Sequence, residues 1–460
     1  MKNLFGHIKT IHIVGIGGIG MSSIAEFLLK EGLAVSGSDA RESSITKHLQ
    51  SLGITFYKGH SAKNIQKADL IVHSSAVKPD NPEILEANLR TIPVIKRPAL
   101  LREIVKLRHY SIGVAGTHGK TSTSSLLASV LCSADLDPTL IVGGIDKNLQ
   151  SNSRTGSGPW LVIEADEYDR TFLSLEPAMG IVTSIDVDHL DIYKDLNDIQ
   201  DAFLQYCNAI PFWGQLLVCS DDPGIVRILP RITSPVTTYG FKDGSNYRVS
   251  HYTQTDQKTQ FSLEKDGVQY GPFELSFPGK HNILNASAVA GLCLNLSIPL
   301  PAIQEGLATF RGVERRFDLR GVIDNIAYID DYAHHPAEIK QTLAAVKGRW
   351  PDKKILCIFQ PHLYSRTRDF ADDFAQALSE ADETVITGIY PAREKPIPGI
   401  TSQLITEKMT SRVYYLDDIE ELTEFVRPII RENMVVIAMG AGNITHYFNE
   451  LVNRQRTLRV

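Results

Sequence analysis

Apolar runs of strand length alternate with segments of helical periodicity along the first hundred residues. The pattern predicts strands at 11–14, 34–38 and 70–73 and helices at 20–30 and 99–107. Such alternation of strands and helices is typical of a parallel, doubly wound sheet.

A second segment begins near Ser111. Its predicted strands include 160–163, 181–185 and 216–219. Between about 240 and 278, alternating apolar and polar residues with Gly and Asp turns predict an antiparallel appendage. Two predicted helices, 282–295 and 301–309, close this section.

A third alternation of strands and helices starts at Gly312. Its predicted strands are 327–329, 355–359, 383–387, 412–415 and 434–438. The first segment ends after the proline-flanked stretch 93–98. The pattern therefore predicts three consecutive α/β domains, with the ranges 1–108, 109–312 and 313–460.

The composition of the 460 residues, 43% apolar and 22% charged, is that of a soluble globular protein with more than one core. A net charge of −6 is not the basic balance that nucleic-acid binding requires. The apolar stretch 11–29 contains His12, Glu26 and four glycines, so it is not a membrane span. The five cysteines form no Cys-x-x-Cys pair. We therefore expect a cytoplasmic protein that binds no nucleic acid and inserts into no membrane.

Residues 113–121 read Gly-Val-Ala-Gly-Thr-His-Gly-Lys-Thr and precede a helix predicted at 122–131. A small-residue turn at a helix N-terminus directs backbone N–H groups at one point, where the helix dipole favours an anion. Lys120 adds a charge for the outer phosphates of a nucleoside triphosphate, and the Thr121 hydroxyl is a usual Mg²⁺ ligand. The strict phosphate-loop pattern requires glycine where Val114 stands, so a plain strand-to-helix connection stays the alternative. The nucleotide-binding candidates are Gly116, Thr117, His118, Gly119, Lys120, Thr121 and Ser122.

An earlier glycine cluster, Gly15-Ile16-Gly17-Gly18-Ile19-Gly20, fits G-x-G-x-x-G between a strand and a helix. Asp39 ends the next strand, where an acid for a ribose is expected, and this fingerprint by itself indicates NAD. Physically it requires only a diphosphate at the helix N-terminus, whatever nucleoside carries it. Glycines that merely allow close helix packing are the remaining alternative.

Carboxylates follow two predicted strands of the second segment. The sequence Glu164-Ala165-Asp166-Glu167-Tyr168-Asp169 comes after strand 160–163, and Asp186-Val187-Asp188-His189-Leu190-Asp191 after strand 181–185. The carboxyl ends of parallel strands form the ligand-binding edge of a sheet, and clustered carboxylates repel one another unless a cation is near. Glu164 and His189 are therefore candidate metal ligands. The alternative is a solvated acidic loop with a hydrogen-bonded histidine.

Asn282 and Asn285 share one helix face and suit a purine edge, but helix capping by Asn282 is equally consistent with the sequence. In the third segment, arginines at 366 and 368 lie beside a strand end and suit a carboxylate or a phosphate. The adjacent histidines His334 and His335 seldom reach one ion from a loop, so we favour substrate contact there over zinc. The segments 390–394 and 440–444 end later strands and are expected to form the rim of the same site.

Taken together, these motifs resemble the Mur ligase family along nearly the whole chain. In order they are G-I-G-G-I-G-M, G-T-H-G-K-T, E-A-D-E, D-H-x-D, H-N-x-x-N, R-R-F-D, D-D-Y-x-H-H-P, F-Q-P-H-x-Y-S-R-T and Y-P-A-R-E. Each motif alone is modest evidence, but nine in the family's order are very improbable by chance. The resemblance implies an N-terminal Rossmann-like domain for a UDP-sugar, a central P-loop ATPase domain with a mixed sheet, and a C-terminal Rossmann-like domain.

The resemblance also implies a role for single residues. The expected catalytic residues are Lys120, Glu164, His189, Arg316 and Asp331, and the expected metal ligands are Thr121, Glu164 and His189. Arg315 and Asp330 are neighbours of the matched pair and leave its register open by one residue. ATP would be bound by residues 116–122 with Asn282 and Asn285 at the adenine. The UDP-sugar would be bound by Gly15, Gly17, Gly18, Gly20, Asp39 and Ser74, and the substrate carboxylate and amino acid by Tyr332, His334, His362 and Arg366.

The implied activity is ATP- and Mg²⁺-dependent ligation of an amino acid to UDP-N-acetylmuramate through an acyl phosphate, in peptidoglycan precursor synthesis. Sister ligases carry a carbamylated lysine after the D-H-x-D histidine, and the absence of lysine between Lys194 and Lys242 agrees with L-alanine as the amino acid. We expect a monomer or a weak homodimer. The alternatives are a recycling ligase for an intact tripeptide, a folate polyglutamate ligase, a dehydrogenase fused to a phosphate loop, and a non-catalytic nucleotide switch.

Overall fold

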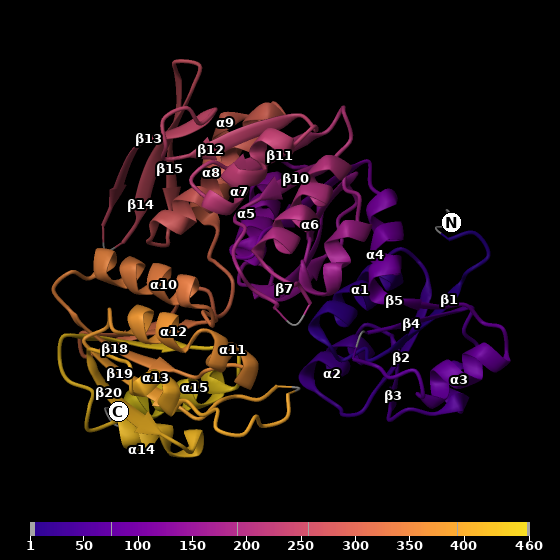
Figure 1. Cartoon of the computed structure of the whole chain (residues 1–460). Coiled ribbons are helices and arrows are strands. Elements are labelled where there is room, and N and C mark those ends of the chain that lie inside the picture. Colours follow the sequence, from indigo (N-terminus) through magenta and orange to yellow (C-terminus); the bar gives the residue numbers. More distant parts are fainter. Residues whose placement is uncertain (1–4, 75, 191, 256, 393, 458–460) are drawn as a thin grey trace. The chain divides into compact units, whose positions relative to one another are not determined.

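The structure, a computed structural model, describes residues 5–457 except 75, 191, 256 and 393, and it leaves the side chains of Ile19 and Asp169 undescribed. Asp191 of the D-H-x-D motif and Arg393 of the Y-P-A-R-E motif thus lie outside the described residues. The strands form three sheets in the described part of the chain, with helices between them, which confirms the expected α/β class (Figure 1). None of the helices described is both long and apolar enough to cross a membrane.

The first sheet has parallel strands in the order β3-β2-β1-β4-β5. Its strands are β1 (Thr10–Val14), β2 (Ala34–Asp39), β3 (Thr55–Lys58), β4 (Leu70–His73) and β5 (Val94–Lys96), and its helices are α1 (Ile19–Lys30), α2 (Ser44–Ser51), α3 (Pro82–Leu89) and α4 (Arg97–Lys106). The winding direction reverses between β1 and β4, and ligands bind at such a switch point. Gly15 follows β1 and Ser74 follows β4, and a Cβ built on Gly15 would lie 3.0 Å from Ser74 Oγ. The two loops therefore meet at this crevice.

The second sheet runs in the order β15-β14-β13-β12-β11-β10-β6-β9-β7-β8. Its strands are β6 (Tyr110–Ala115), β7 (Thr139–Asp146), β8 (Ser151–Arg154), β9 (Trp160–Glu164), β10 (Met179–Val182), β11 (Gln215–Cys219), β12 (Val236–Gly240), β13 (Tyr247–Gln254), β14 (Thr259–Lys265) and β15 (Val268–Leu275). The accompanying helices are α5 (Lys120–Ser133), α6 (Leu196–Ala209), α7 (Pro223–Ile228), α8 (Lys280–Asn295) and α9 (Leu300–Thr309). Strand β6 lies between β9 and β10 and is parallel to both. The loops after these three strands therefore gather at one edge of the sheet.

The strands expected to form an antiparallel appendage, β13 to β15, lie beyond β12 at the end of the central sheet. Asp266 and Gly267, with φ of 52° and 76°, join β14 to β15 as in a two-residue hairpin. The strand expected at 181–185 ends at Val182, because the next residues leave the sheet and hydrogen-bond to the loop after β6.

The third sheet has the order β16-β17-β21-β18-β19-β20. Its strands are β16 (Asp318–Ile323), β17 (Ile326–Asp331), β18 (Lys354–Phe359), β19 (Glu383–Thr387), β20 (Arg412–Leu416) and β21 (Met434–Met439), and its helices are α10 (Pro336–Arg349), α11 (Tyr364–Asp369), α12 (Ala371–Leu378), α13 (Gln403–Thr406), α14 (Leu422–Val426) and α15 (Ile444–Thr457). Alternate residues of β18 enter different cores: Cys357 packs with α10 and α12, whereas Ile358 packs with α14 and α15. A sheet with both faces covered explains the continuous apolar strands of this segment.

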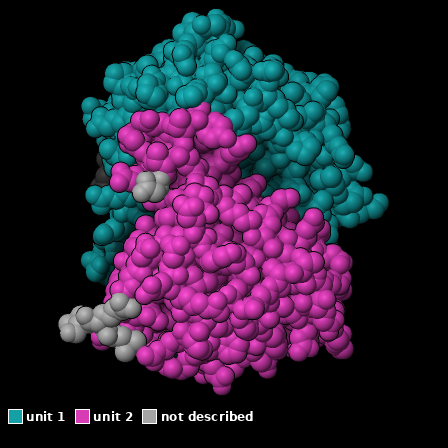
Figure 2. Space-filling model, turned by 90° about the vertical axis from the view of Figure 1, so that its left-hand side faces the viewer, with its two compact units in different colours: residues 1–251, 261–273, 284–311 teal, residues 252–260, 274–283, 312–460 magenta. Residues whose placement is uncertain are grey.

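The chain divides into two compact units, which Figure 2 distinguishes by colour. One unit comprises residues 1–251, 261–273 and 284–311, and the other comprises 252–260, 274–283 and 312–460. The first sheet and most of the second belong to the first unit, whereas the ends of β13, β14 and β15 at 252–254, 259–260 and 274–275 belong to the other. Within the first unit, Asn152 Nδ2 of β8 donates to Ser23 Oγ of α1 at 2.5 Å. The domain boundaries at 108 and 312 stay predictions.

Candidate functional site

The loop between β6 and α5 has the backbone that its glycines favour. Gly116 and Gly119 have φ of 137° and 83°, and a Cβ built on Gly116 would lie 2.0 Å from Thr183 Oγ1. Helix α5 begins at Lys120, two residues earlier than predicted, and Gly119 gives its N-terminus no side-chain cap. Backbone N–H groups of the first turn are therefore available to an anion.

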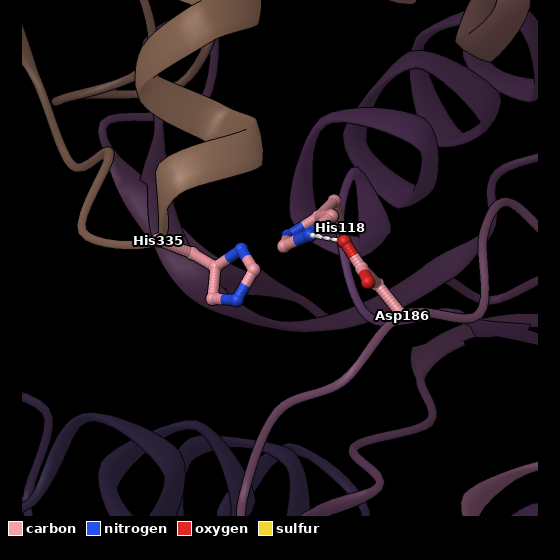
Figure 3. A group of neighbouring side chains, drawn as sticks. All are labelled: His118, Asp186 and His335. Carbon is pink, nitrogen blue, oxygen red and sulfur yellow. Dashed lines mark ion pairs between the residues drawn. The ribbon is translucent and has the colours of Figure 1, made fainter. Parts of the chain in front are cut away.

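The loop is tied to the residues that follow β10. Thr117 N donates to Ser184 O at 3.0 Å, and His118 N donates to Ser184 Oγ at 3.0 Å. Asp186 N donates to Thr117 Oγ1 at 2.9 Å. His118 Nε2 lies 3.6 Å from Asp186 Oδ2, as the dashed line in Figure 3 marks. These contacts hold the phosphate loop against the neighbouring strand end.

Lys120 is the cation of this loop, and its side chain is 12% exposed. Its Nζ donates to Gly116 O at 2.7 Å, to Thr117 O at 3.3 Å and to Glu167 Oε2 at 2.6 Å. Burial opposes its charge, but the carboxylate of Glu167, with Asp166 and Glu164, outweighs burial and raises the pKa of Lys120. Lys120 therefore keeps its charge inside the loop.

Glu167 is the functional candidate that the sequence did not single out. Its carboxylate is 3% exposed, and burial raises its pKa to about 7 despite the ion pair with Lys120. Its Oε1 lies 3.7 Å from His189 Nε2. The place of Glu167 directly after a strand was visible in the sequence, but its partners were not, because they follow other strands of the sheet.

The structure brings together two of the three expected metal ligands. Thr121 Oγ1 donates to Glu164 Oε1 at 3.0 Å, and Gly143 N donates to Glu164 Oε2 at 2.7 Å. The third, His189, lies beside Glu167 and Asp188, with Nε2 3.9 Å from Asp188 Oδ2. Hydroxyl and carboxylate oxygens are the ligands Mg²⁺ prefers, and the ammonium of Lys120 is close by for phosphate. The donor set fits a nucleoside triphosphate with its Mg²⁺.

The two asparagines of the H-N-x-x-N motif lie in the first turns of α8. Asn282 Nδ2 donates to Pro278 O at 2.7 Å, so the alternative that Asn282 caps the helix is wrong, because a cap must accept from an N–H group. Asn285 is buried, and its Oδ1 lies 2.8 Å from a Cβ built on Gly119. The structure thus brings Asn285 against the phosphate loop.

In the glycine cluster after β1, Asp39 supports the loop itself. Gly17 N donates to Asp39 Oδ2 at 2.9 Å, and Gly15 N donates to Ser38 O at 2.8 Å. The carboxylate therefore orders the turn that precedes α1. Binding of the UDP-sugar by this loop stays a prediction.

In the third segment the sequence left open whether Arg315 or Arg316, and whether Asp330 or Asp331, contacts the nucleotide. Arg315 donates to the carbonyls of Gly440 and Gly442, and Asp330 is paired with Arg320 at 2.8 Å. Arg316 Nη1 lies 3.6 Å from Glu338, and Asp331 accepts from the backbone of Phe317 and Ala333 at 2.7 Å each. Burial raises the pKa of Asp331 to about 6. All four side chains therefore have partners within the protein, and the choice of Arg316 and Asp331 for the nucleotide stays a prediction.

Three of the four residues expected at the substrate carboxylate lie close together at the ends of β17 and β18. The ring centroids of Tyr332 and His334 are 5.2 Å apart, and those of His334 and His362 are 6.0 Å apart. His362 stacks on Tyr390 at 5.8 Å. Arg366 is buried in α11, which begins two residues after His362. His335, also drawn in Figure 3, accepts from Ala337 N and caps α10, so the adjacent histidines have different partners.

Comparison with known proteins identifies the family of the chain. Family models described as "Mur ligase family, catalytic domain", "Mur ligase middle domain" and "Mur ligase, glutamate ligase domain" match residues 10–109, 114–293 and 315–442. Proteins named UDP-N-acetylmuramate–L-alanine ligase from Geobacter sp. strain M21 and Trichlorobacter lovleyi are each 44% identical, covering 96% and 98% of this chain and 96% and 100% of their own. The crystal structure of UDP-N-acetylmuramate–alanine ligase from Thermotoga maritima matches with a TM-score of 0.83 and 32% identity, over 98% of this chain and 100% of that one. The chain therefore belongs to the Mur ligase family.

Proposed function

We propose that this chain joins L-alanine to the carboxylate of UDP-N-acetylmuramate at the expense of ATP, as a step of peptidoglycan precursor synthesis. The observation that carries the proposal is the 44% identity, over nearly the full length of both chains, to relatives named for this activity. The pairing of Thr121 with Glu164 and the buried charge of Lys120 support it, because they suit a triphosphate. A dehydrogenase, the alternative left open by the first glycine cluster, gives these residues no role.

The chemistry requires activation of an acid. A carboxylate does not react with an amine at neutral pH, because oxide would have to leave. A carboxylate oxygen therefore attacks the γ-phosphorus of ATP, the bond to ADP breaks, and an acyl phosphate forms. The amine of L-alanine then attacks the acyl carbon and loses a proton, and the tetrahedral intermediate expels phosphate as the amide forms.

The residues of the chain act in this scheme by position and charge. Lys120 and the N–H groups at the start of α5 stabilise the charge on the phosphates. A bound Mg²⁺, held by Thr121 and Glu164, would neutralise further phosphate charge. We assign Tyr332, His334, His362 and Arg366 to the substrate carboxylate and the amino acid. No side-chain nucleophile is needed.

The test is phosphate release from ATP, measured with each substrate alone and with both. We expect release only with UDP-N-acetylmuramate and L-alanine together. When the sugar carboxylate carries ¹⁸O, one labelled oxygen should appear in the released phosphate. Unlabelled phosphate, or turnover only with NAD and a hydroxy acid, would contradict the proposal.

Selectivity for the amine separates this proposal from a recycling ligase that adds an intact tripeptide. A panel of alanine, serine, glycine and the tripeptide, assayed for kcat/KM, should give the highest value with alanine. A higher value with the tripeptide would favour the recycling activity on the same sugar.

Glu164→Gln should raise the Mg²⁺ concentration for half-maximal activity by about tenfold or more. The amide keeps the size of the side chain but removes the charge that faces Thr121 Oγ1. The measurement is a MgCl₂ titration of phosphate release at fixed ATP. Glu176→Gln is the matched control, because Glu176 lies in the same segment and its side chain is 51% exposed. An unchanged Mg²⁺ requirement in Glu164→Gln would show that the ion is held elsewhere.

A further inference from the structure

Arg97, the first residue of α4, lies over the start of α1. A Cβ built on Gly20 would lie 2.7 Å from Arg97 Cζ and 2.8 Å from each of its terminal nitrogens. Gly20 is the second residue of α1 and the last glycine of the first cluster. The guanidinium therefore occupies the space beside the first turn of this helix that a side chain at position 20 would need.

The guanidinium has few protein partners there. Its Nε is buried and has no hydrogen-bond partner, and within the described residues its terminal nitrogens make no hydrogen bond or ion pair. Burial lowers the pKa of Arg97, although the charges of the Asp166 and Glu164 carboxylates oppose that effect. Each guanidinium carries five N–H donors, and a partly buried one without acceptors is unfavourable.

The N-terminus of α1 makes the position of the Arg97 guanidinium still less favourable. The N-terminus of a helix carries a partial positive charge, so a cation beside Gly20 is repelled by α1. An anion bound at the same point would be attracted by both the helix and the guanidinium. The protein thus holds two groups of like charge at one point, where a doubly charged anion would satisfy both.

We propose that Arg97 binds the diphosphate of the UDP-sugar, together with the first-turn N–H groups of α1. The inference rests on the proposed function, which supplies a nucleoside diphosphate sugar as substrate. A guanidinium suits this ligand because its planar donors engage two phosphate oxygens at once.

This contact gives a reason for glycine at position 20. In the usual dinucleotide fingerprint the last glycine allows close packing of helix and strand. Here the neighbour of Gly20 is the end of a flexible arginine side chain. Gly20→Ala should therefore fold and displace the guanidinium, and it should weaken diphosphate binding in the wild type but not in a variant that lacks Arg97.

The experiment compares the affinities of wild type, Arg97→Gln and Arg97→Lys for UDP-N-acetylmuramate, UDP and uridine by titration calorimetry. We expect Arg97→Gln to weaken both diphosphates by roughly 30- to 100-fold and uridine by less than about threefold. Arg97→Lys, which keeps the charge but not the planar donors, should lose less. Arg102→Ala is the matched control on α4, because its side chain is 45% exposed and faces Glu176 at 3.9 Å.

The outcomes separate the two proposals. Equal affinity of Arg97→Gln and wild type for UDP overturns the role of Arg97. A loss confined to kcat of the ligation also overturns it, because that result would place the guanidinium at the sugar carboxylate. If the wild type binds UDP-N-acetylmuramate but never ligates L-alanine, the proposed function fails while the diphosphate site stands. If the wild type binds neither diphosphate, both proposals fail. Thermal unfolding of each variant checks the fold, and Gly20→Ala tests the contact independently if Arg97→Gln is unstable.

Discussion

Lys120→Ala should lower kcat/KM for ATP by about 1000-fold or more, while the chain still folds. Nζ of Lys120 is held in the phosphate loop by Gly116 O and Glu167, next to the uncapped N-terminus of α5. Removing one preorganised donor to developing charge costs about 3–4 kcal/mol, and Lys120 contributes a full charge as well. The measurement is steady-state phosphate release with both other substrates saturating.

The control for Lys120→Ala is the double variant with Glu167→Gln. Without Lys120, the buried carboxylate of Glu167 loses its ion pair, and removing one partner of such a pair destabilises by about 3 kcal/mol. Glu167→Gln removes the unpaired charge, so the double variant should recover most of the stability and none of the activity. Activity that returned together with stability would mean that Lys120 acts through the fold and not on phosphate.

Glu83→Ala should have the largest effect on stability, about 3–5 kcal/mol in the region of the first sheet. The Glu83 side chain on α3 is fully buried, and its carboxylate accepts from Ser38 Oγ at 2.7 Å, His60 Nδ1 at 2.9 Å and Asn64 Nδ2 at 2.6 Å. Alanine would leave these groups without their acceptor. Hydrogen exchange of peptides covering β2 and α3 should report the loss, and Glu86→Ala, on the same helix and partly exposed, should leave exchange unchanged.

The carboxylate of Glu83 also determines how the stability of this region depends on pH. Burial works against its charge, but the His12 imidazole at 3.5 Å and the hydrogen bonds from Ser38, Asn64 and His60 outweigh burial and lower the pKa of Glu83 to about 2. The stabilisation is therefore complete above pH 4.5 and is lost between about pH 4.5 and 2, by up to about 3 kcal/mol. Glu83→Gln should flatten this part of the curve of unfolding free energy against pH. An equally steep fall in wild type and Glu83→Gln would contradict the lowered pKa.

Much of the fold and of the candidate site followed from local patterns. The sequence predicted the tight turn at Gly116 and Gly119 and, to within two residues, the start of α5. Both features depend on residues next to one another in the chain. Glu164 and His189 were candidates because Glu164 ends β9 and His189 lies in the loop after β10, and the carboxyl ends of parallel strands meet at one edge. Membership of the Mur ligase family was indicated by the order of such local motifs.

Only the tertiary structure decided which of these groups are partners. Glu167 pairs with Lys120 because β9 lies beside β6. The order of strands in a sheet cannot be predicted from any short stretch of the sequence. Strand β10 ends at Val182, because Ser184 O accepts a hydrogen bond from Thr117 N in the loop after β6. The strands near 240–278 extend the central sheet because β13 pairs with β12, and this pairing joins residues of different strands.

The chain's sequence by itself thus determined which turns, helices and strand ends carry polar chemistry, since these depend on the conformational preferences of adjacent residues. The structure decided the pairing of Asp330 with Arg320, the burial of Glu83 and the place of Arg97 beside Gly20. Each of these contacts joins residues from different elements, and the free energy that selects them comes from burial and charge in the packed protein.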